Sequence, residues 1–483
     1  MKKCISFPAL LPIAISLTGC MVGPRYQRPA APVPPEFKEN SAIAPGWKLG
    51  APNDVALKGD WWTLYRDPQL NALEPQVDTA NQGLKISEAN FRAARAVVGF
   101  ARADQAPTIG TSPNAGTVRD SANSPYFDKT LANNGSGNLI LPLDLNYEVD
   151  LWGRVRRQVA MAQAEMQENA ADLANARLSL HAELAMDYFG LRSADAREKL
   201  LDDTIHAYQD AYDLTKQRVD GDLAVQSDVD QAEAQLHQAQ VQRNDVEIQR
   251  SQLEHAIAIL VGKPPAMFTL ASDPGAIHSL AVPRGPVALP SALLERRPDI
   301  AIQERQMAAA NEAIGIAKAA YYPSLSISAI AGIQSISPAD WFTWPSRFWA
   351  VGGTLSETLF DAGRRHARTN QAAANYDASV ASYRQTVLQS FQQVEDTLTA
   401  LRVLQTESEN QHGATAASLR ALKAFKERYD GGLELYLQVV VAQTTALGNQ
   451  RNDIDIIQRQ LDASVLLIKA LGGGWTTQQL PGF

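Results

Sequence analysis

The stretch LILPLDLNYEVDLWGRVRRQV (139–159) changes its hydrophobic period near Gly153. From Leu139 to Leu151, every second residue is apolar. The positions between them carry Asp144, Asn146, Glu148 and Asp150. This period of two predicts a β-strand with one apolar and one acidic face. The roughly sixty residues that follow contain no proline and are rich in Ala, Gln, Glu and Leu, which predicts a very long helix.

The composition of the 483-residue chain argues against several classes of protein. A net charge of −8 argues against a nucleic-acid partner, because binding to the phosphate backbone needs a basic surface. Beyond the N-terminus, no run of about eighteen apolar residues predicts a membrane-spanning helix, although strands of a membrane barrel give much weaker signals. The two cysteines, Cys4 and Cys20, both lie near the start and predict neither a disulfide framework nor a zinc cluster.

The first residues have the pattern of a secretory signal. Two lysines form a basic start, FPALLPIAISL (7–17) has the length of a hydrophobic signal core, and LTGC (17–20) matches the bacterial lipobox. We therefore expect residues 1–19 to be a signal peptide and Cys20 to carry lipid. A plain signal peptide with an incidental cysteine is the alternative.

The residues from Cys20 onward predict where the protein is anchored. By the usual bacterial sorting rule, an aspartate after the lipidated cysteine retains a lipoprotein at the inner membrane, whereas this chain has Met21. We therefore expect the bacterial outer membrane, with the protein extending into the periplasm. Residues 20–62 are rich in proline and small residues, which predicts an extended tether.

An internal repeat organises the rest of the chain. QRVDGDLAVQ (217–226) aligns with ERYDGGLELY (427–436), and the same offset carries Gly262 onto Gly472. Each half then reads helix, proline, strand, loop, strand, Gly-Arg, long helix, glycine turn and second helix. Chance similarity between Ala- and Gln-rich helices is the alternative, but it does not explain why non-helical residues recur in the same order.

The repeat sets the expected domain boundaries. The first repeat covers residues 63–275, with a strand pair at about 106–151. The second covers residues 276–471, with a strand pair at about 322–360. Residues 472–483 then form a C-terminal tail.

The predicted strands differ in quality. SLSISAIAGIQ (324–334) alternates between apolar and small polar residues, whereas 108–120 and 347–360 are less regular. Between the later strands, SPADWFTWPSRFW (337–349) concentrates aromatic residues. Such a cluster is typical of the interface between a membrane and water, and a buried core cluster is the alternative.

The long helices and the few strands together suggest an assembly. Residues 154–217 and 364–428 each predict a helix on the order of 95 Å long, which suits a rod, a coiled coil or a tunnel wall. Four strands cannot close a membrane barrel, since single-chain barrels begin at about eight strands, and an open sheet edge is costly in lipid. If the strands enter a membrane, several copies must pool them, with the acidic residues of 144–150 facing the water inside.

These motifs resemble the TolC-like outer-membrane factors, in particular the lipoprotein branch with the OprM- and NodT-like efflux proteins. The resemblance covers essentially the whole mature chain. It rests on CMVGPRYQRP (20–29), WWTLYRDPQL (61–70), LLERRPDIAIQERQMAAANEAIGIAKAAYYPSLSI (293–327), LFDAGRR (359–365) and the two glycine turns. It implies an α+β membrane protein in which four strands per protomer form a trimeric 12-stranded β-barrel, continuous with a long periplasmic α-helical barrel.

The resemblance also implies a function. The protein would be the outer-membrane channel of a tripartite efflux system, which exports small toxic compounds or drugs from an inner-membrane pump through a periplasm-spanning tunnel. Its partners would be two further copies of itself, a periplasmic adaptor (membrane fusion) protein, an inner-membrane pump for which we expect the RND type, and outer-membrane lipid. No cofactor is implied. The exported substrate and the pump family remain open, because the pump largely selects the substrate.

The helix turns are the functional sites that the resemblance implies. In similar proteins the tips of these turns meet the adaptor, which gives as contact candidates Arg218, Gly221, Leu223, Arg428, Gly431 and Leu433. Nearby side chains narrow the periplasmic entrance, and the candidates for this constriction are Asp228, Gln231, Tyr436, Leu437 and Val441.

The segment YLQVVVAQ (436–443) departs from the family's YLxxLDAQ-type pattern. Val441 stands where the family often has an aspartate, and Thr444 stands where an arginine is common. We therefore expect a more apolar constriction made by Leu437 and Val441. Packing between neighbouring helices is the alternative role for these residues.

The sequence contains no recognisable catalytic or metal-binding pattern. The seven histidines include no pair at metal-ligand spacing on one helical turn, and the GxxxxGK[ST] and GxSxG motifs are absent. We therefore expect neither enzymatic activity nor a metal. Two other functions stay open: a lipid-anchored structural coiled-coil protein, and the tunnel of a type I protein secretion system.

Overall fold

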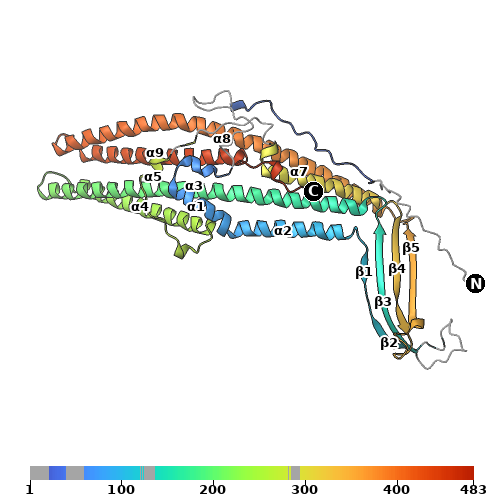
Figure 1. Cartoon of the computed structure of the whole chain (residues 1–483). Coiled ribbons are helices and arrows are strands. Elements are labelled where there is room, and N and C mark those ends of the chain that lie inside the picture. Colours follow the sequence, from blue (N-terminus) through green and yellow to red (C-terminus); the bar gives the residue numbers. More distant parts are fainter. Residues whose placement is uncertain are drawn as a thin grey trace, which may run out of the picture. The chain divides into compact units, whose positions relative to one another are not determined.

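The computed structural model describes residues 21–39, 59–119, 121, 123, 136–280, 282–283 and 294–482 (Figure 1). The predicted signal peptide and Cys20 lie outside the described residues. The chain folds into two compact units, and each unit draws on both sequence repeats. The first unit takes its residues from 1–29, 93–166 and 305–380, and the second from 30–92, 167–304 and 381–483.

The first unit contains one antiparallel sheet. Its strands are β1 (Thr108–Gly110), β2 (Asn114–Val118), β3 (Ser136–Val149), β4 (Ser324–Ser335) and β5 (Arg347–Ser356). Their order is β1-β3-β4-β5, and β2 also pairs with β3. Because β1 and β2 pair with different parts of β3, they are two pieces of one edge strand. The four strands per chain predicted from the sequence are confirmed, with the first of them broken.

The break in the edge strand has a local cause. Pro113 lies between β1 and β2 and has no N–H to donate to a neighbouring strand, so it cannot complete a sheet ladder. The Thr111 hydroxyl donates instead to the carbonyl of Pro142 on β3, at 2.6 Å. The irregular sequence of 108–120 is therefore a strand held partly by a side chain.

The strand register extends the alternation of β3 across the sheet. Leu145 pairs with Ile109 on β1 and with Ala329 on β4, and Ala329 pairs with Val351 on β5. We call this side the apolar face; it carries Leu139, Leu141, Leu143, Leu145, Tyr147 and Val149 from β3, Leu325, Ile327, Ala329, Ala331 and Ile333 from β4, and Trp349, Val351 and Leu355 from β5. The opposite side, the polar face, carries Asp144, Asn146 and Glu148, with Ser326 and Ser328 paired beside them.

The helices repeat with the spacing found in the sequence. They are α1 (Pro68–Ala80), α2 (Gln82–Ala103), α3 (Arg154–Asp220), α4 (Gln226–Leu260), α5 (Ala276–Ser279), α7 (Pro298–Ala319), α8 (Arg364–Asp430) and α9 (Tyr436–Ala470). Helices α3 and α8 have 67 residues each, and α4 and α9 have 35 each. One offset carries the bounds of α3 onto those of α8 and the bounds of α4 onto those of α9, which confirms the internal repeat.

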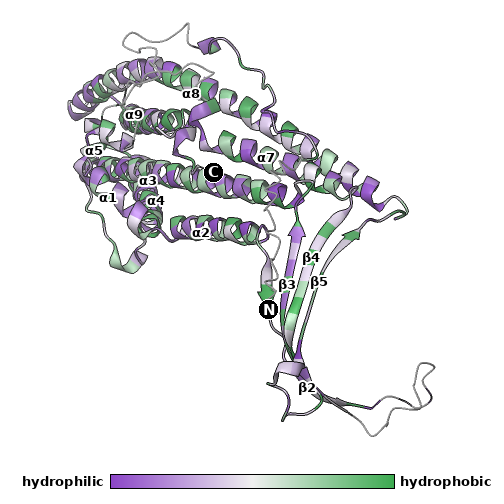
Figure 2. Ribbon diagram, turned by 45° about the vertical axis from the view of Figure 1, so that its right-hand side comes forward, coloured by the Kyte–Doolittle hydropathy of each residue, from purple (hydrophilic) through white to green (hydrophobic). Residues whose placement is uncertain are grey.

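Helices α2 and α7 are a further equivalent pair. Each has 22 residues, and a slightly larger offset carries Gln82 onto Pro298 and Ala103 onto Ala319. Short 3-10 helices complete the described fold: η3 (Trp61–Tyr65), η4 (Pro265–Met267), η5 (Trp344–Ser346) and η6 (Thr477–Gln479). Polar and apolar residues are mixed along the long helices (Figure 2), and among the described residues no helix combines the length and the apolar character needed to cross a membrane.

One arginine and one aspartate explain why the acidic strand β3 runs directly into α3. Arg154 donates to both carboxylate oxygens of Glu148, at 2.9 and 2.6 Å. Asp150 accepts the backbone N–H groups of Val155 and Arg156, and so caps the first turn of α3. Acidic residues near a helix N-terminus are also favoured by the helix dipole. Glu148 and Asp150 therefore stabilise the start of α3. This role is additional to the expected one of facing water inside a barrel.

Candidate functional site

The second unit contains the turn between α3 and α4 and the turn between α8 and α9. Helices α3 and α8 end at these turns in the same way. At the end of α3, the N–H of Leu223 donates to the carbonyl of Arg218 at 2.8 Å, and at the end of α8 the N–H of Leu433 donates to that of Arg428 at 2.9 Å. This hydrogen bond spans six residues and is typical of the Schellman motif at a helix C-terminus. The motif needs a residue with a left-handed backbone conformation just before the leucine.

The left-handed residues are not the glycines that the sequence singled out. They are Asp222, with φ 61°, and its repeat equivalent Gly432, with φ 72°. Gly221 and Gly431 precede them and have no positive φ among the described backbone angles. Asp222 is tolerated because the short side chain of aspartate fits this region better than most.

Arg218 joins the two turns. Its guanidinium donates to the carbonyls of Tyr429 and Asp430, at 3.1 and 3.3 Å, and lies 4.2 Å from the centre of the Tyr429 ring. A cation at the C-terminus of a helix stabilises the exposed carbonyls there, and the aromatic face adds a cation–π contact. In Figure 1 the α3–α4 turn and the α8–α9 turn accordingly lie at the same end of the second unit.

The equivalent arginine of the second repeat has a different partner. Arg428 forms an ion pair with Glu434 at 3.2 Å, and 60% of its side chain is exposed. The sequence did not identify Tyr429 as part of this site. The repeat alignment could have indicated Tyr429, because the equivalent residue in the first repeat is Val219. Only one of the two turns therefore has an aromatic residue at this position.

Tyr436 lies inside the turn region and not on its surface. It is 3% exposed and packs in a cluster with Ala232, Tyr429, Val439 and Val440. Its ring centre lies 5.4 Å from that of Tyr429. Burial raises the pKa of Tyr436 to about 12, and the nearby charge of Asp228 on α4 adds to the rise. The structure thus brings the starts of α4 and α9 together.

Leu437 and Val441 lie on the exposed side of α9, one helical turn apart. Their side chains are 57% and 53% exposed. Gln231 on α4 is also exposed, and Asp228 is half-buried. At the turns themselves Leu223 and Leu433 are 81% and 75% exposed. Apolar side chains that point away from the described core of one chain suit a contact with another molecule or with another copy.

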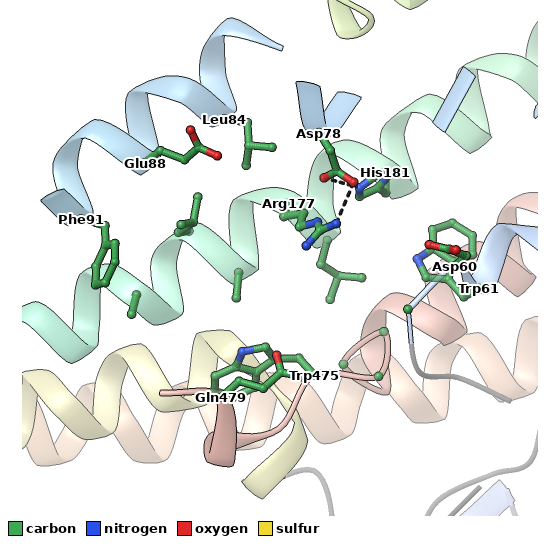
Figure 3. A pocket seen from close by; sticks show the side chains of 18 of the residues that line it. Asp60, Trp61, Asp78, Leu84, Glu88, Phe91, Arg177, His181, Trp475 and Gln479 are labelled. Carbon is green, nitrogen blue, oxygen red and sulfur yellow. Dashed lines mark hydrogen bonds and ion pairs between the residues drawn. The ribbon is translucent and has the colours of Figure 1, made fainter. Parts of the chain in front are cut away.

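A second candidate site in the same unit was not predicted from the sequence. It is a cavity of about 590 Å³, and the residues around it include Trp62, Phe91, Arg177, His181, Trp475 and Gln479. Figure 3 shows Asp78 between His181 and Arg177, with Trp475 and Gln479 across the cavity. Segments from both ends of the chain form its walls, so no local motif in the sequence could indicate it.

A network of ionisable side chains, buried at Glu74 and His181 and exposed at Arg177, forms one wall of this cavity. The His181 ring lies between two carboxylates, with Nδ1 2.6 Å from Glu74 and Nε2 3.2 Å from Asp78. Arg177 donates to the other oxygen of Asp78 at 2.7 Å, and the Trp62 ring stacks on His181 at 4.5 Å. Burial raises the pKa of Glu74 to about 7, although its hydrogen bond and charge interaction with His181 oppose this. Among the described residues, no group of histidine, cysteine and acidic side chains has the arrangement of a metal site.

Comparisons with known proteins agree with this architecture. The family model described as outer membrane efflux protein matches residues 67–263 and 289–473. The chain is 32% identical to outer membrane protein OprJ of Pseudomonas aeruginosa, over 98% of this chain and 97% of that protein. It is 29% identical to the toluene efflux pump outer membrane protein TtgC of Pseudomonas putida, over 97% of this chain and 96% of that protein.

The solved structures give the same result. The outer-membrane channel OprN has a TM-score of 0.84 and 28% identity, and the match covers 94% of this chain and 100% of that chain. The similarity inferred from the sequence motifs, the α+β fold class with its internal repeat and the outer-membrane location are thereby confirmed. The chain belongs to the outer membrane efflux protein family and is an outer-membrane efflux channel.

Proposed function

We propose that three copies of this chain form one channel, in which their strands close a twelve-stranded barrel and their long helices continue it as a tunnel. The four-stranded sheet supports this proposal most directly. It has one continuous apolar face, and the strands at its two edges, β1 with β2 and β5, have no further strand partner among the described residues. Unpaired backbone groups cost several kcal/mol each in lipid, so the edges must pair with those of other copies.

The tunnel passes small toxic compounds outward from an inner-membrane pump, with a periplasmic adaptor between the two. The relatives whose names refer to efflux pumps support this role, as does the length of α3 and α8. The two turns offer the adaptor a surface of exposed leucines with charged residues beside them, and the contact candidates on it are Arg218, Gly221, Leu223, Arg428, Gly431 and Leu433. A pump of the RND type is the expected energy source.

The entrance of the tunnel is an apolar constriction made by Leu437 and Val441, with Asp228 and Gln231 beside it. The exposed position of both apolar side chains on α9 supports this assignment, and buried Tyr436 holds the helix start in place behind them. An aspartate in place of Val441 would add a negative charge to each copy. A ring of like charges in a narrow, low-dielectric pore attracts cations.

We extend the proposal to the ends of the chain. Residues 1–19 act as a signal peptide, and Cys20 carries the lipid. Residues 20–62 form the tether, two structural repeats cover 63–275 and 276–471, and residues 472–483 form the tail. The family model, which matches the chain in two segments, supports the two repeats.

The native mass of the protein, extracted from outer membranes in mild detergent, tests the assembly. We expect a trimer, because three sheets of four strands close a barrel that one sheet cannot close. A folded monomer that stays in the membrane only through its lipid would instead favour a lipid-anchored coiled-coil protein.

Conductance of the purified protein in planar bilayers tests the constriction. We expect Val441→Asp to raise the preference for cations severalfold, because three new carboxylates would line the entrance. Val441→Thr is the matched control, since it keeps the size of the side chain without a charge. Identical ion selectivity in the wild type and in Val441→Asp would remove Val441 from the entrance and leave it a packing role.

A further inference from the structure

The chain just after Cys20 is held against the first unit. We call Met21–Pro24 the N-terminal strap. The N–H of Val22 donates to the carbonyl of Trp152 at 3.0 Å, between the end of β3 and the start of α3. Met21 packs over Gly153, where an added Cβ would lie only 2.8 Å from the Met21 Cγ atom. The strap therefore lies at the junction between the sheet and the long helix.

One buried arginine makes two hydrogen bonds to the strap. Arg157 on α3 is 2% exposed. Its Nε donates to the Val22 carbonyl at 2.7 Å, and its Nη2 donates to the Pro24 carbonyl at 3.1 Å. Its Nη1 donates to the carboxylate of Glu312 on α7 at 2.7 Å. The arginine thus binds two strap carbonyls while its charge is balanced by Glu312.

Two glycines allow the strap to approach so closely. Gly23 has φ 109°, and a Cβ added to it would lie 2.7 Å from the Cα of Gly315 on α7. A Cβ added to Gly315 would overlap the Arg157 guanidinium. Buried Asn311 adds a hydrogen bond from its side chain to the Pro24 carbonyl at 3.3 Å. Any larger residue at either glycine would push the strap away from Arg157.

The internal repeat shows that ordinary helix packing does not need this arginine. The offset between α3 and α8 carries Arg157 onto Ala367, and the offset between α2 and α7 carries Ala96 onto Glu312. Gly315 corresponds to Gly99, where an added Cβ would meet nothing within 4 Å. The ion pair is therefore present in one of the two equivalent places. The strap contacts only one of these two places, and the arginine and glutamate occur at that one.

We propose that Arg157 is a positioning residue for the lipid anchor. By holding the strap, it makes the acyl chains leave the protein at the sheet–helix junction, where the apolar face of the sheet ends. Cys20 directly precedes Met21 in the chain, so a fixed strap limits where the lipid is attached. This inference rests on the proposed lipidation of Cys20.

Aromatic residues mark the same level of the molecule. Trp152 stacks on Tyr322 with 4.7 Å between ring centres, and its indole N–H donates to the Pro323 carbonyl at 2.8 Å. Tryptophan and tyrosine with one apolar and one hydrogen-bonded end are typical of the interface between lipid and water. An anchor released here enters the membrane beside the inner boundary of the sheet and sets its depth.

Trypsin cleavage after the exposed Arg25 measures how firmly the strap is held. We expect Arg157→Met to release the lipidated peptide 20–25 at least about tenfold faster than the wild type, because the strap loses two charge-assisted hydrogen bonds. Arg157→Lys keeps the charge beside Glu312 but cannot bind both carbonyls, so it should give an intermediate rate. Arg365→Met is the matched control, since Arg365 pairs with Asp361 at the start of α8. Equal cleavage rates in Arg157→Met and Arg365→Met would overturn the proposal.

A double-mutant cycle with Cys20→Ser separates positioning from general stability. The quantity measured is the amount of protein assembled in the outer membrane. If Arg157 acts through the anchor, Arg157→Met should lower this amount in the lipidated protein and have no further effect in Cys20→Ser. Additive losses would assign Arg157 a structural role and overturn the proposal.

Two further measurements complete the test. Arg157→Met combined with Glu312→Leu removes the ion pair without leaving a buried charge, so it keeps the cycle usable if the single variant misfolds. The mass of the N-terminal peptide shows whether Cys20 is acylated, and an unmodified cysteine would overturn the proposal. Bilayer conductance of the non-lipidated protein tests the channel function separately. If the anchor proposal is wrong, the proposed channel function is not affected.

Discussion

Arg218 and Arg428 occupy equivalent positions in the two repeats but differ in what they stabilise. Arg218 binds the last carbonyls of α8 and the Tyr429 ring, whereas Arg428 forms a largely exposed ion pair. We expect Arg218→Leu to weaken the contact between the two turns by about 1–2 kcal/mol. Arg428→Leu should cost less than about 0.5 kcal/mol, because exposed ion pairs contribute little.

Hydrogen exchange of the backbone amides at 431–433 measures this difference. Exchange should accelerate in Arg218→Leu and stay close to the wild-type rate in Arg428→Leu, which serves as the control. The reverse order would show that the exposed ion pair, and not the bridge to α8, holds the second turn closed.

Glu74 gives the second unit a dependence on pH. Its pKa rises from 4.5 to about 7 on folding, mainly through burial, so the folded protein binds a proton that the unfolded chain releases. This contribution to stability is complete below about pH 4.5 and is lost as the pH rises through about 7. We expect Glu74→Gln to reduce the fall in the free energy of unfolding across this range by on the order of 1–3 kcal/mol.

Thermal unfolding of the detergent-solubilised protein between pH 4.5 and 7.5 checks this expectation. Part of the pH dependence should remain, because burial also raises the pKa of Asp187 to about 6 and of Asp462 to about 7. His181 on α3 contacts both Glu74 and Asp78, and Arg177 on α3 pairs with Asp78. These three groups stay in place in the variant. An unchanged slope in Glu74→Gln would show that Glu74 is already ionised in the folded protein at these pH values.

At the scale of single elements, an aspartate a few residues before α3 and another before α8 cap the starts of these two long helices. Asp150 accepts two backbone N–H groups at the start of α3 and pairs with Arg156, while Asp361 accepts two at the start of α8 and pairs with Arg365. Such caps contribute about 1 kcal/mol each. We expect Asp150→Ala to fray the first turn of α3, visible as faster hydrogen exchange at Val155 and Arg156.

The second helix provides the control for this prediction. Asp361→Ala should fray α8 and leave exchange at the start of α3 unchanged. If Asp150→Ala produced no local change, the Arg154–Glu148 pair alone would be sufficient to start α3.

The elements could be predicted from the sequence because their signals are local. The hydrophobic period, the proline and glycine punctuation and the constant offset between the repeats indicated the strands, the long helices and their equivalence. Contacts between distant segments had no such signal. Glu74 and His181 lie 107 residues apart, and Arg157 and Glu312 lie 155 apart, so neither pair could be recognised before the chain was folded.

The turns show that backbone angles also have no clear signal in the sequence. The recurring glycines marked the correct place, but the left-handed conformation falls on Asp222 and Gly432, one residue later. Sequence patterns locate a turn better than they assign its backbone angles, because several turn geometries accept glycine at neighbouring positions.

At the scale of the whole molecule, the two faces of the sheet should respond differently to charge. Val351 and Ala350 are neighbours on β5, and the register places Val351 on the apolar face with Ala329 and Leu145, whereas Ala350 pairs with Ile330 beside Asp144 on the polar face. If the apolar face meets lipid, a charge at Val351 costs about 2–4 kcal/mol at mid-membrane depth. A charge at Ala350 would lie in water and cost little.

We therefore expect Val351→Lys to reduce the trimer recovered from outer membranes severalfold and Ala350→Lys to leave it near the wild-type amount. The two variants add the same side chain one residue apart on the same strand, so general effects of lysine on β-structure are matched. The measurement is the ratio of trimer in the membrane to total protein. Equal losses in both variants would mean that the sheet has no lipid-facing side, and the pooled barrel would then have to be abandoned while the helical unit and its turns stayed as they are.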